Sequence, residues 1–341
     1  MVGRHRRLLA RGRRSRARSD GRKQGRGPVP VKPRALKKGG TIGIIAPASP
    51  PSSTEKIFKG AEYLERLGYR IKFGKHVEKV YGYLAGSDQE RADDINDMFK
   101  DEEIKAIIAV RGGYGTPRIL PLLDYAAIKR NPKILVGYSD LTALQLALFK
   151  RTGLVTFSGP MAGVEMFKGI DPFTEEHFWR MLTSSKKMGT VNNPDGREFH
   201  PIVGGKASGI LLGGNLSLIT ALAGSQFLPS FKEALLFIEE VEEESYRFDR
   251  MMNQLRLAGI LDDTNGIIIG ELTDVKAHDT TKPHLTAEQV LRDFLSHLKK
   301  PVMSGLVYGH VSKKLTMPIG IRGTIDTKKQ RLSFDESGVR A

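Results

Sequence analysis

Short apolar runs alternate with amphipathic segments along the first half of the chain. Ser87-Asp88-Gln89-Glu90 has the spacing of a capping box, so it predicts the start of a helix that continues to Phe99. Strands are predicted at 41–46, 69–73, 104–110 and 133–136, and further helices at 54–67 and 141–149. Strands that alternate with helices indicate a parallel sheet with both faces covered.

The same alternation resumes after the polar segment 192–197, which we interpret as a linker or hairpin. Further strands are predicted at 209–215, 234–238, 266–270 and 301–307, and further helices at 216–222, 246–257 and 286–298. The sequence therefore predicts two α/β domains. We expect an N-terminal parallel-sheet domain over 34–165, a linker region over 166–206 and a C-terminal α/β domain over 207–341.

The positive charge is confined to one end of the chain. The whole sequence has a net charge of +16, but residues 1–38 contain 15 Lys and Arg and only one acidic residue. We predict that residues 1–33 are a disordered basic tail, since they hold too few large apolar residues to form a core. Three interpretations stay open: a nucleic-acid-binding arm, an organelle transit segment, or an extension without a role.

Other features of composition narrow the class of protein. The chain has no cysteine, which excludes disulfides and thiol catalysis and fits a cytoplasmic location. No apolar run approaches the roughly 20 residues that span a bilayer, so we expect no membrane partner. We find no metal-ligand spacing and expect no metal or other cofactor.

Ser139 lies between a predicted buried strand and a predicted helix. A serine at such a turn can be a nucleophile whose hydroxyl projects from the edge of the sheet, as in a nucleophile elbow. The first N–H groups of the helix would then point toward a nearby oxyanion. The alternative is that Ser139 only caps the helix.

Glu239 and His310 also follow apolar strands, at the edge where open α/β sheets form their sites. Serine, histidine and a carboxylate are the residue types that acyl transfer needs, because the histidine takes the serine proton and the carboxylate orients the histidine. Glu239 has a simpler explanation as part of the acidic cluster 239–244, and His310 as a turn residue. His278 and His284 are competing histidines in a polar loop.

The turn Arg111-Gly112-Gly113-Tyr114-Gly115 follows another predicted strand. It lacks the glycine spacings of dinucleotide and P-loop sites. Its glycines can instead bring backbone N–H groups close to a substrate, or simply supply a tight turn.

Several segments in the same order resemble one known family, the serine LD-carboxypeptidases, also called muramoyltetrapeptide carboxypeptidases. The resemblance covers residues 34–337. It is carried by Gly-Ile-Ile-Ala-Pro-Ala-Ser at 43–49, Arg-Gly-Gly-Tyr-Gly at 111–115, Gly-Tyr-Ser-Asp at 137–140, Leu-Gly-Gly-Asn at 212–215, Phe-Ile-Glu-Glu at 237–240 with Tyr-Arg-Phe-Asp-Arg at 246–250, and Gly-His at 309–310 with Leu-Thr-Met-Pro-Ile-Gly at 315–320. The basic tail departs from the family pattern, as does Glu-Glu where members often have Glu-Asp.

The resemblance implies a role for each candidate residue. Ser139 is expected to be the nucleophile, His310 the general base and Glu239 its orienting carboxylate, in a cleft between the two domains. The expected oxyanion hole consists of backbone N–H groups of Gly112, Gly113 and Asp140. We expect Arg111 and Asn215 to bind substrate, with the Arg111 guanidinium on the terminal carboxylate.

The implied reaction is hydrolysis of the L,D-peptide bond that releases terminal D-alanine from cytoplasmic murein tetrapeptide, a step of peptidoglycan recycling. A homodimer is expected, with a small murein peptide as partner and no specific nucleic acid. Two alternatives stay open. One is a microcin-C-immunity-like serine peptidase that cleaves an aminoacyl-nucleotide amide. The other is a nucleic-acid-binding protein that acts through its basic tail.

Overall fold

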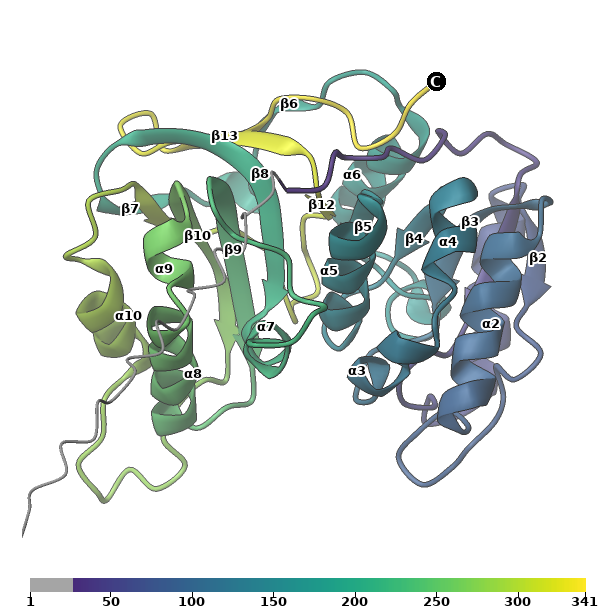
Figure 1. The fold of residues 1–341 in the computed structure, drawn as a ribbon, viewed down its shortest axis with the longest axis horizontal. Helices are drawn as coiled ribbons and strands as arrows, with labels where there is room; N and C mark the ends of the chain where they lie inside the picture. Colours follow the sequence, from purple (N-terminus) through teal and green to yellow (C-terminus); the bar gives the residue numbers. More distant parts are fainter. Residues whose placement is uncertain (1–26) are drawn as a thin grey trace, which may run out of the picture.

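The computed structural model describes residues 27–341, which form two sheets joined side by side (Figure 1). Of the predicted basic tail over 1–33, residues 1–26 lie outside the described part. The rest of that tail contacts the N-terminal half, where the Val31 N–H donates to the Gly153 carbonyl at 2.8 Å. Across the described residues, no helix is both long enough and apolar enough to cross a membrane.

The N-terminal sheet has six strands in the order β12-β5-β4-β3-β1-β2. Strands β1 to β5 are parallel, and the inner ones are almost entirely buried, which is why their sequences are nearly continuous apolar runs. The strands are β1 (Thr41–Ile45), β2 (Arg70–Phe73), β3 (Ile104–Ala109), β4 (Ile134–Val136), β5 (Thr156–Ser158) and β12 (Met317–Ile319).

Helices accompany this sheet on both faces. The predicted capping box at Ser87 is confirmed, because its side chain accepts from the Glu90 N–H while the Glu90 side chain accepts from the Ser87 N–H. The helices of this half are α1 (Glu55–Arg66), α2 (Asp88–Lys100), α3 (Thr116–Ile119), η1 (Leu120–Leu122), α4 (Tyr125–Arg130), α5 (Leu141–Thr152), η2 (Met166–Lys168) and α6 (Pro172–Thr183).

The C-terminal sheet has eight strands in the order β6-β14-β13-β8-β9-β10-β11-β7. Its centre, β8 to β11, is parallel, and the outer strands are antiparallel. The strands are β6 (Gly189–Val191), β7 (His200–Val203), β8 (Lys206–Asn215), β9 (Ala234–Val241), β10 (Gly266–Thr273), β11 (Val302–Ser304), β13 (Arg322–Asp326) and β14 (Arg331–Phe334). The remaining helices are η3 (Pro194–Gly196), α7 (Leu216–Ala221), α8 (Ser245–Leu257), α9 (Ile260–Asp263) and α10 (Ala287–Leu295), of which α8, α9 and α10 lie over one face of the sheet in Figure 1.

The expected domain boundaries differ from the observed ones in two places. The segment 166–206, expected as a linker, contains η2, α6 and η3 together with β6 and β7, which are both edge strands of the C-terminal sheet. Strand β12 comes from the segment expected in the C-terminal domain, but it pairs antiparallel with β5 of the N-terminal sheet. Its apolar residues complete the edge of that sheet, so the chain crosses between the halves more than once.

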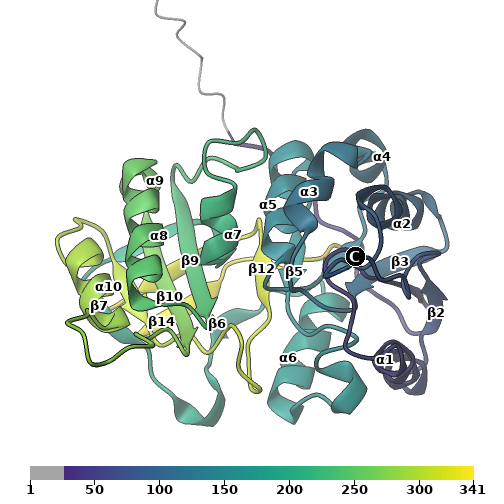
Figure 2. The same cartoon turned by 90° about the horizontal axis from the view of Figure 1, so that it is seen from below.

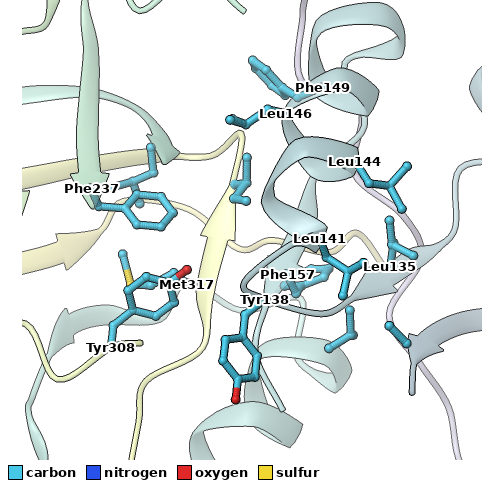
Figure 3. Close-up of a cluster of buried hydrophobic side chains, with 14 of the residues drawn as sticks. Leu135, Tyr138, Leu141, Leu144, Leu146, Phe149, Phe157, Phe237, Tyr308 and Met317 are labelled. Atoms are coloured by element: carbon cyan, nitrogen blue, oxygen red, sulfur yellow. The ribbon is translucent and has the colours of Figure 1, made fainter. Parts of the chain in front are cut away.

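Helix α5 and strand β12 lie at the boundary between the two halves in both views (Figures 1 and 2). Ten of the twelve residues of α5 are buried, because both halves cover it. Figure 3 shows the buried apolar side chains here, with Phe237 and Tyr308 from the C-terminal half on one side and Leu141 and Phe157 from the N-terminal half on the other. Burial of this shared core holds the two sheets together.

Candidate active site

Ser139 occupies a strained turn between β4 and α5. Its φ of 65° is uncommon for a residue other than glycine, and such a strained turn between a strand and a helix is the geometry of a nucleophile elbow. The helix begins after Asp140, and Ser139 offers it only a backbone carbonyl, which accepts from the Thr142 N–H. The Ser139 hydroxyl is therefore directed away from the helix.

A hydrogen-bonded chain joins this hydroxyl to the other half of the molecule. His310 Nε2 lies 3.0 Å from Ser139 Oγ, and His310 Nδ1 lies 2.8 Å from Glu239 Oε2. The Glu239 carboxylate is fully buried, and about a fifth of the His310 side chain is exposed. Since a carboxylate only accepts, Nδ1 carries the proton and Nε2 is free to accept the serine proton.

Backbone geometry brings Glu239 and His310 this close. Glu239 lies within β9, which extends three residues further than predicted, to Val241. Gly309 has a φ of 129°, and a Cβ there would be 2.9 Å from Glu239 Oε2. Any other residue at 309 would press on the carboxylate, so the glycine lets the histidine segment approach β9.

Two of the predicted oxyanion residues, Gly112 and Asp140, lie directly beside Ser139, and Gly113 follows in the same turn. A Cβ on Gly112 would be 3.0 Å from the Ser139 Cβ, so the glycine turn after β3 directly contacts the serine. Asp140 ties this turn to the elbow, because its carboxylate accepts from the N–H groups of Gly115 at 3.1 Å and Thr116 at 2.8 Å. Burial raises the pKa of Asp140, while these bonds oppose the shift.

The backbone N–H groups predicted to form an oxyanion hole have no acceptor within the described part of the chain. Among the hydrogen bonds of residues 27–341, none uses the backbone N–H of Gly112, Gly113 or Asp140 as donor. Backbone N–H groups held beside a nucleophile are the donors that stabilise a tetrahedral oxyanion.

A buried ion pair lies beside the candidate site, and sequence reasoning missed it. The Glu165 carboxylate accepts from Lys314 Nζ at 2.7 Å, from the Tyr138 hydroxyl at 2.8 Å and from the Met161 N–H at 2.9 Å. Lys314 Nζ also lies 4.0 Å from the centre of the Tyr138 ring, which packs edge-to-face with the His310 ring. Burial, and next the negative Glu165, raise the pKa of Tyr138 well above its usual value. Lys314 precedes an apolar segment in the sequence, and nothing in that pattern predicts its buried ion pair with Glu165.

The structure does not bring Asn215 to the substrate pocket. Its side chain is buried, caps α7 at the Leu218 N–H and donates to Glu240 Oε1 at 2.9 Å. Glu240 also accepts from Ser217, so both residues form a network behind Glu239. This placement supports a positioning role for Asn215 rather than the expected contact with substrate.

The competing histidines lie elsewhere. His278 pairs with Glu244 at 3.0 Å, and His284 Nδ1 lies 2.9 Å from the Lys282 carbonyl, both on an exposed loop. Neither lines the pocket at Ser139.

A pocket of about 320 Å³ opens over Ser139 and His310. Arg111 lines it, half-buried, and its guanidinium donates only a long bond of 3.4 Å to the Pro50 carbonyl. Arg111 therefore has donors left for a ligand. Within residues 27–341, no group of three or more His, Cys, Asp or Glu side chains is placed to hold a metal ion.

Two family models match the chain in succession. A model described as the LD-carboxypeptidase N-terminal domain matches residues 42–159, and one described as the LD-carboxypeptidase C-terminal domain matches residues 208–325. The chain belongs to the LD-carboxypeptidase family. This confirms the resemblance carried by the sequence motifs, and the family and the relatives identify the protein as a peptidase, a hydrolase of peptide bonds.

Relatives of this chain match it over most of its length. A Bacillus subtilis (strain 168) protein named probable murein peptide carboxypeptidase is 40% identical over 309 residues, which is 90% of this chain and 95% of the relative. The structure of wild-type Microcin C7 self immunity protein MccF, a protein known from Escherichia coli, has a TM-score of 0.83 at 29% identity and covers 91% of this chain and 100% of its own.

A muramoyltetrapeptide carboxypeptidase from Oxalobacter formigenes has a TM-score of 0.77 at 30% identity and covers 88% of this chain and 100% of its own. These likenesses confirm the predicted fold of two α/β domains with a parallel N-terminal sheet.

Proposed function

We propose that the protein is a serine carboxypeptidase that hydrolyses the L,D-peptide bond of murein tetrapeptide and releases terminal D-alanine. The observation that carries the proposal is the hydrogen-bonded chain from Ser139 through His310 to Glu239, which opens onto a pocket. The relatives named as murein peptide and muramoyltetrapeptide carboxypeptidases support the substrate class.

The geometry supports a two-step acyl transfer. Ser139 Oγ attacks the carbonyl carbon while His310 Nε2 takes the hydroxyl proton, and the buried Glu239 stabilises the imidazolium that forms. The negative oxygen of the tetrahedral intermediate accepts from the N–H groups of Asp140 and the Gly112–Gly113 turn. His310 returns the proton to the departing amine of D-alanine. Water then attacks the acyl-enzyme, with His310 again taking the proton, and releases the shortened peptide and the free serine.

Release of a single terminal residue requires recognition of its carboxylate. Arg111 is the residue we assign to this contact, because it lines the pocket next to the glycine turn and a guanidinium binds a carboxylate in a bidentate manner. Replacement by alanine is then expected to raise KM, and an unchanged KM would exclude the contact.

The experiment that tests the proposal is incubation with murein tetrapeptide and detection of released D-alanine by mass spectrometry. We expect turnover by the wild type and a loss of more than about 10³-fold for Ser139→Ala. A wild type as inactive as this variant would refute the assigned reaction.

The likeness to MccF supports a second candidate, an amide hydrolase that acts on an aminoacyl nucleotide. Solved structures of MccF are described in complex with glutamyl sulfamoyl guanosine and aspartyl sulfamoyl adenosine. The aromatic ring of Phe167 lines the pocket here and offers a surface for stacking. Parallel assays with murein tetrapeptide and with an aminoacyl sulfamoyl adenosine separate the two candidates by their kcat/KM.

Binding of nucleic acid by the basic tail is the separate alternative that the sequence leaves open. Removal of residues 1–26, which leaves the described body intact, is expected to abolish any such binding without loss of peptidase activity. A homodimer and a cytoplasmic location also remain predictions, which size-exclusion chromatography with light scattering and cell fractionation can test.

A further inference from the structure

The charged side chains that line the pocket are all positive. Lys56, Arg111 and Lys168 contribute to its wall, and none of the described residues that line it is acidic. This contrasts with the composition of the folded body, in which acidic and basic residues are almost equal in number. A cleft with charges of one sign attracts ligands of the opposite sign.

These three cations have no ionic partner of their own. Among residues 27–341, none of them forms an ion pair within 4.0 Å, whereas the nearby Lys59 pairs with Glu55 at 2.7 Å. Three like charges around one pocket repel one another, which raises the free energy of the protein without a ligand. An anionic ligand would relieve that repulsion.

The cations form two groups at different places in the pocket. Arg111 precedes Gly112, which contacts Ser139. Lys56, on α1, lies with its Nζ 4.7 Å from the centre of the Phe167 ring, and Lys168 is the next residue in the chain after that phenylalanine. Contact between α1 and η2 holds these two lysines on the same wall.

We propose that Lys56 and Lys168 form an anion subsite that binds a second carboxylate of the substrate, in addition to the terminal carboxylate assigned to Arg111. The inference rests on the proposed function and defines its substrate class as peptides with at least two carboxylates. Lysine suits this task because its ammonium is a compact charge on a flexible stem, which can reach a carboxylate without a fixed bidentate geometry.

The test compares two substrates and two lysine variants. The substrates are murein tetrapeptide with free side-chain carboxylates and the same peptide with those carboxylates amidated, while the terminal carboxylate stays free. The variants are the double replacement Lys56→Gln with Lys168→Gln, and the control Lys59→Gln, which changes an exposed lysine of the same helix outside the pocket.

The wild type is expected to hydrolyse the acidic peptide with a KM at least about tenfold lower than the amidated one, at similar kcat. The double variant loses this preference through a higher KM for the acidic peptide, and added salt weakens the preference of the wild type. Lys59→Gln behaves as the wild type. An unchanged KM of the double variant, or an equal loss on both peptides, overturns the subsite.

A binding experiment distinguishes failure of the subsite from failure of the proposed reaction. Calorimetry with Ser139→Ala measures the affinity for both peptides without turnover. If the wild type hydrolyses neither peptide but Ser139→Ala binds the acidic one more tightly through the two lysines, the reaction is refuted and the subsite stands. If the acidic peptide is hydrolysed but bound no better than the amidated one, the subsite is refuted and the reaction stands.

Discussion

Replacement of Lys314 by methionine removes one charge of the buried pair beside the candidate site. The side chains of Lys314 and Glu165 are only 2% and 7% exposed, and their charged atoms lie 2.7 Å apart. Methionine fills a similar volume but leaves the Glu165 carboxylate without a counter-charge. Breaking a buried pair in this way costs about 3–5 kcal/mol of unfolding free energy. Because Tyr138 and Met161 still donate to the carboxylate, we expect a loss of about 3 kcal/mol.

The loss is measurable by urea denaturation. The fluorescence of Trp179, the only tryptophan, reports on α6 in the N-terminal half, and circular dichroism reports on the whole fold. The matched control is Lys313→Met, because Lys313 is the preceding residue and pairs on the surface with the exposed Asp195. We expect little change in stability for this control, since water and salt screen exposed pairs.

A double variant tests the physical reasoning. Adding Glu165→Gln to Lys314→Met removes the stranded charge, so the double variant should be more stable than Lys314→Met alone. Two results would refute this reasoning. One is a loss of unfolding free energy below about 1 kcal/mol for Lys314→Met. The other is a loss in the double variant equal to the sum of the losses in the two single variants, because independent sites are additive.

Three other variants probe the surroundings of the site. Burial lowers the pKa of His177 from 6.5 to about 4, and its Nδ1 accepts from the Thr316 N–H. As the pH falls from 6.5 to 4 the unfolded chain takes up the proton first, so unfolding free energy should drop by about 2–3 kcal/mol in urea titrations, and His177→Gln should flatten this dependence. Gly112→Ala places a methyl group 3.0 Å from the Ser139 Cβ, so kcat should fall at least about tenfold with little change in the urea midpoint. Glu239→Gln exchanges the charged acceptor for an amide and should lower kcat about 10³–10⁴-fold in the D-alanine release assay; an unchanged kcat would remove this carboxylate from the mechanism.

Local patterns predicted the parts of the fold that depend on neighbouring residues. The capping box predicted at Ser87 is confirmed, and the helix predicted over 286–298 also begins with a capping box, at Thr286. Each motif needs only a side chain and a backbone N–H three residues apart. The apolar runs before Arg111 and Ser139 predicted two strands of a parallel sheet, and these are β3 and β4, which pair with each other. Because the carboxyl ends of such strands meet at one edge, the serine and the glycine turn were expected together.

Local patterns did not decide which carboxylate would meet the histidine. Glu239 and Glu240 are consecutive in β9, and neighbouring residues of a strand point to opposite faces. Only pairing of β9 within its sheet turns Glu239 toward His310 and Glu240 toward Asn215. The order of the family's motifs pointed to Glu239, the first of the two carboxylates. The alternation of side chains along β9 could not identify it, because the strand is apolar on both faces.

The amino-acid sequence by itself determined the alternation of strands and helices, the turn that holds Ser139 and the family of the chain. These features depend on residues that are close together in the sequence. Tertiary structure decided the crossing of β12 into the N-terminal sheet, the pairing of Lys314 with Glu165 and the cationic wall of the pocket. Those contacts join residues that are distant in the chain, and their energies exist only once long-range packing has excluded water from between them.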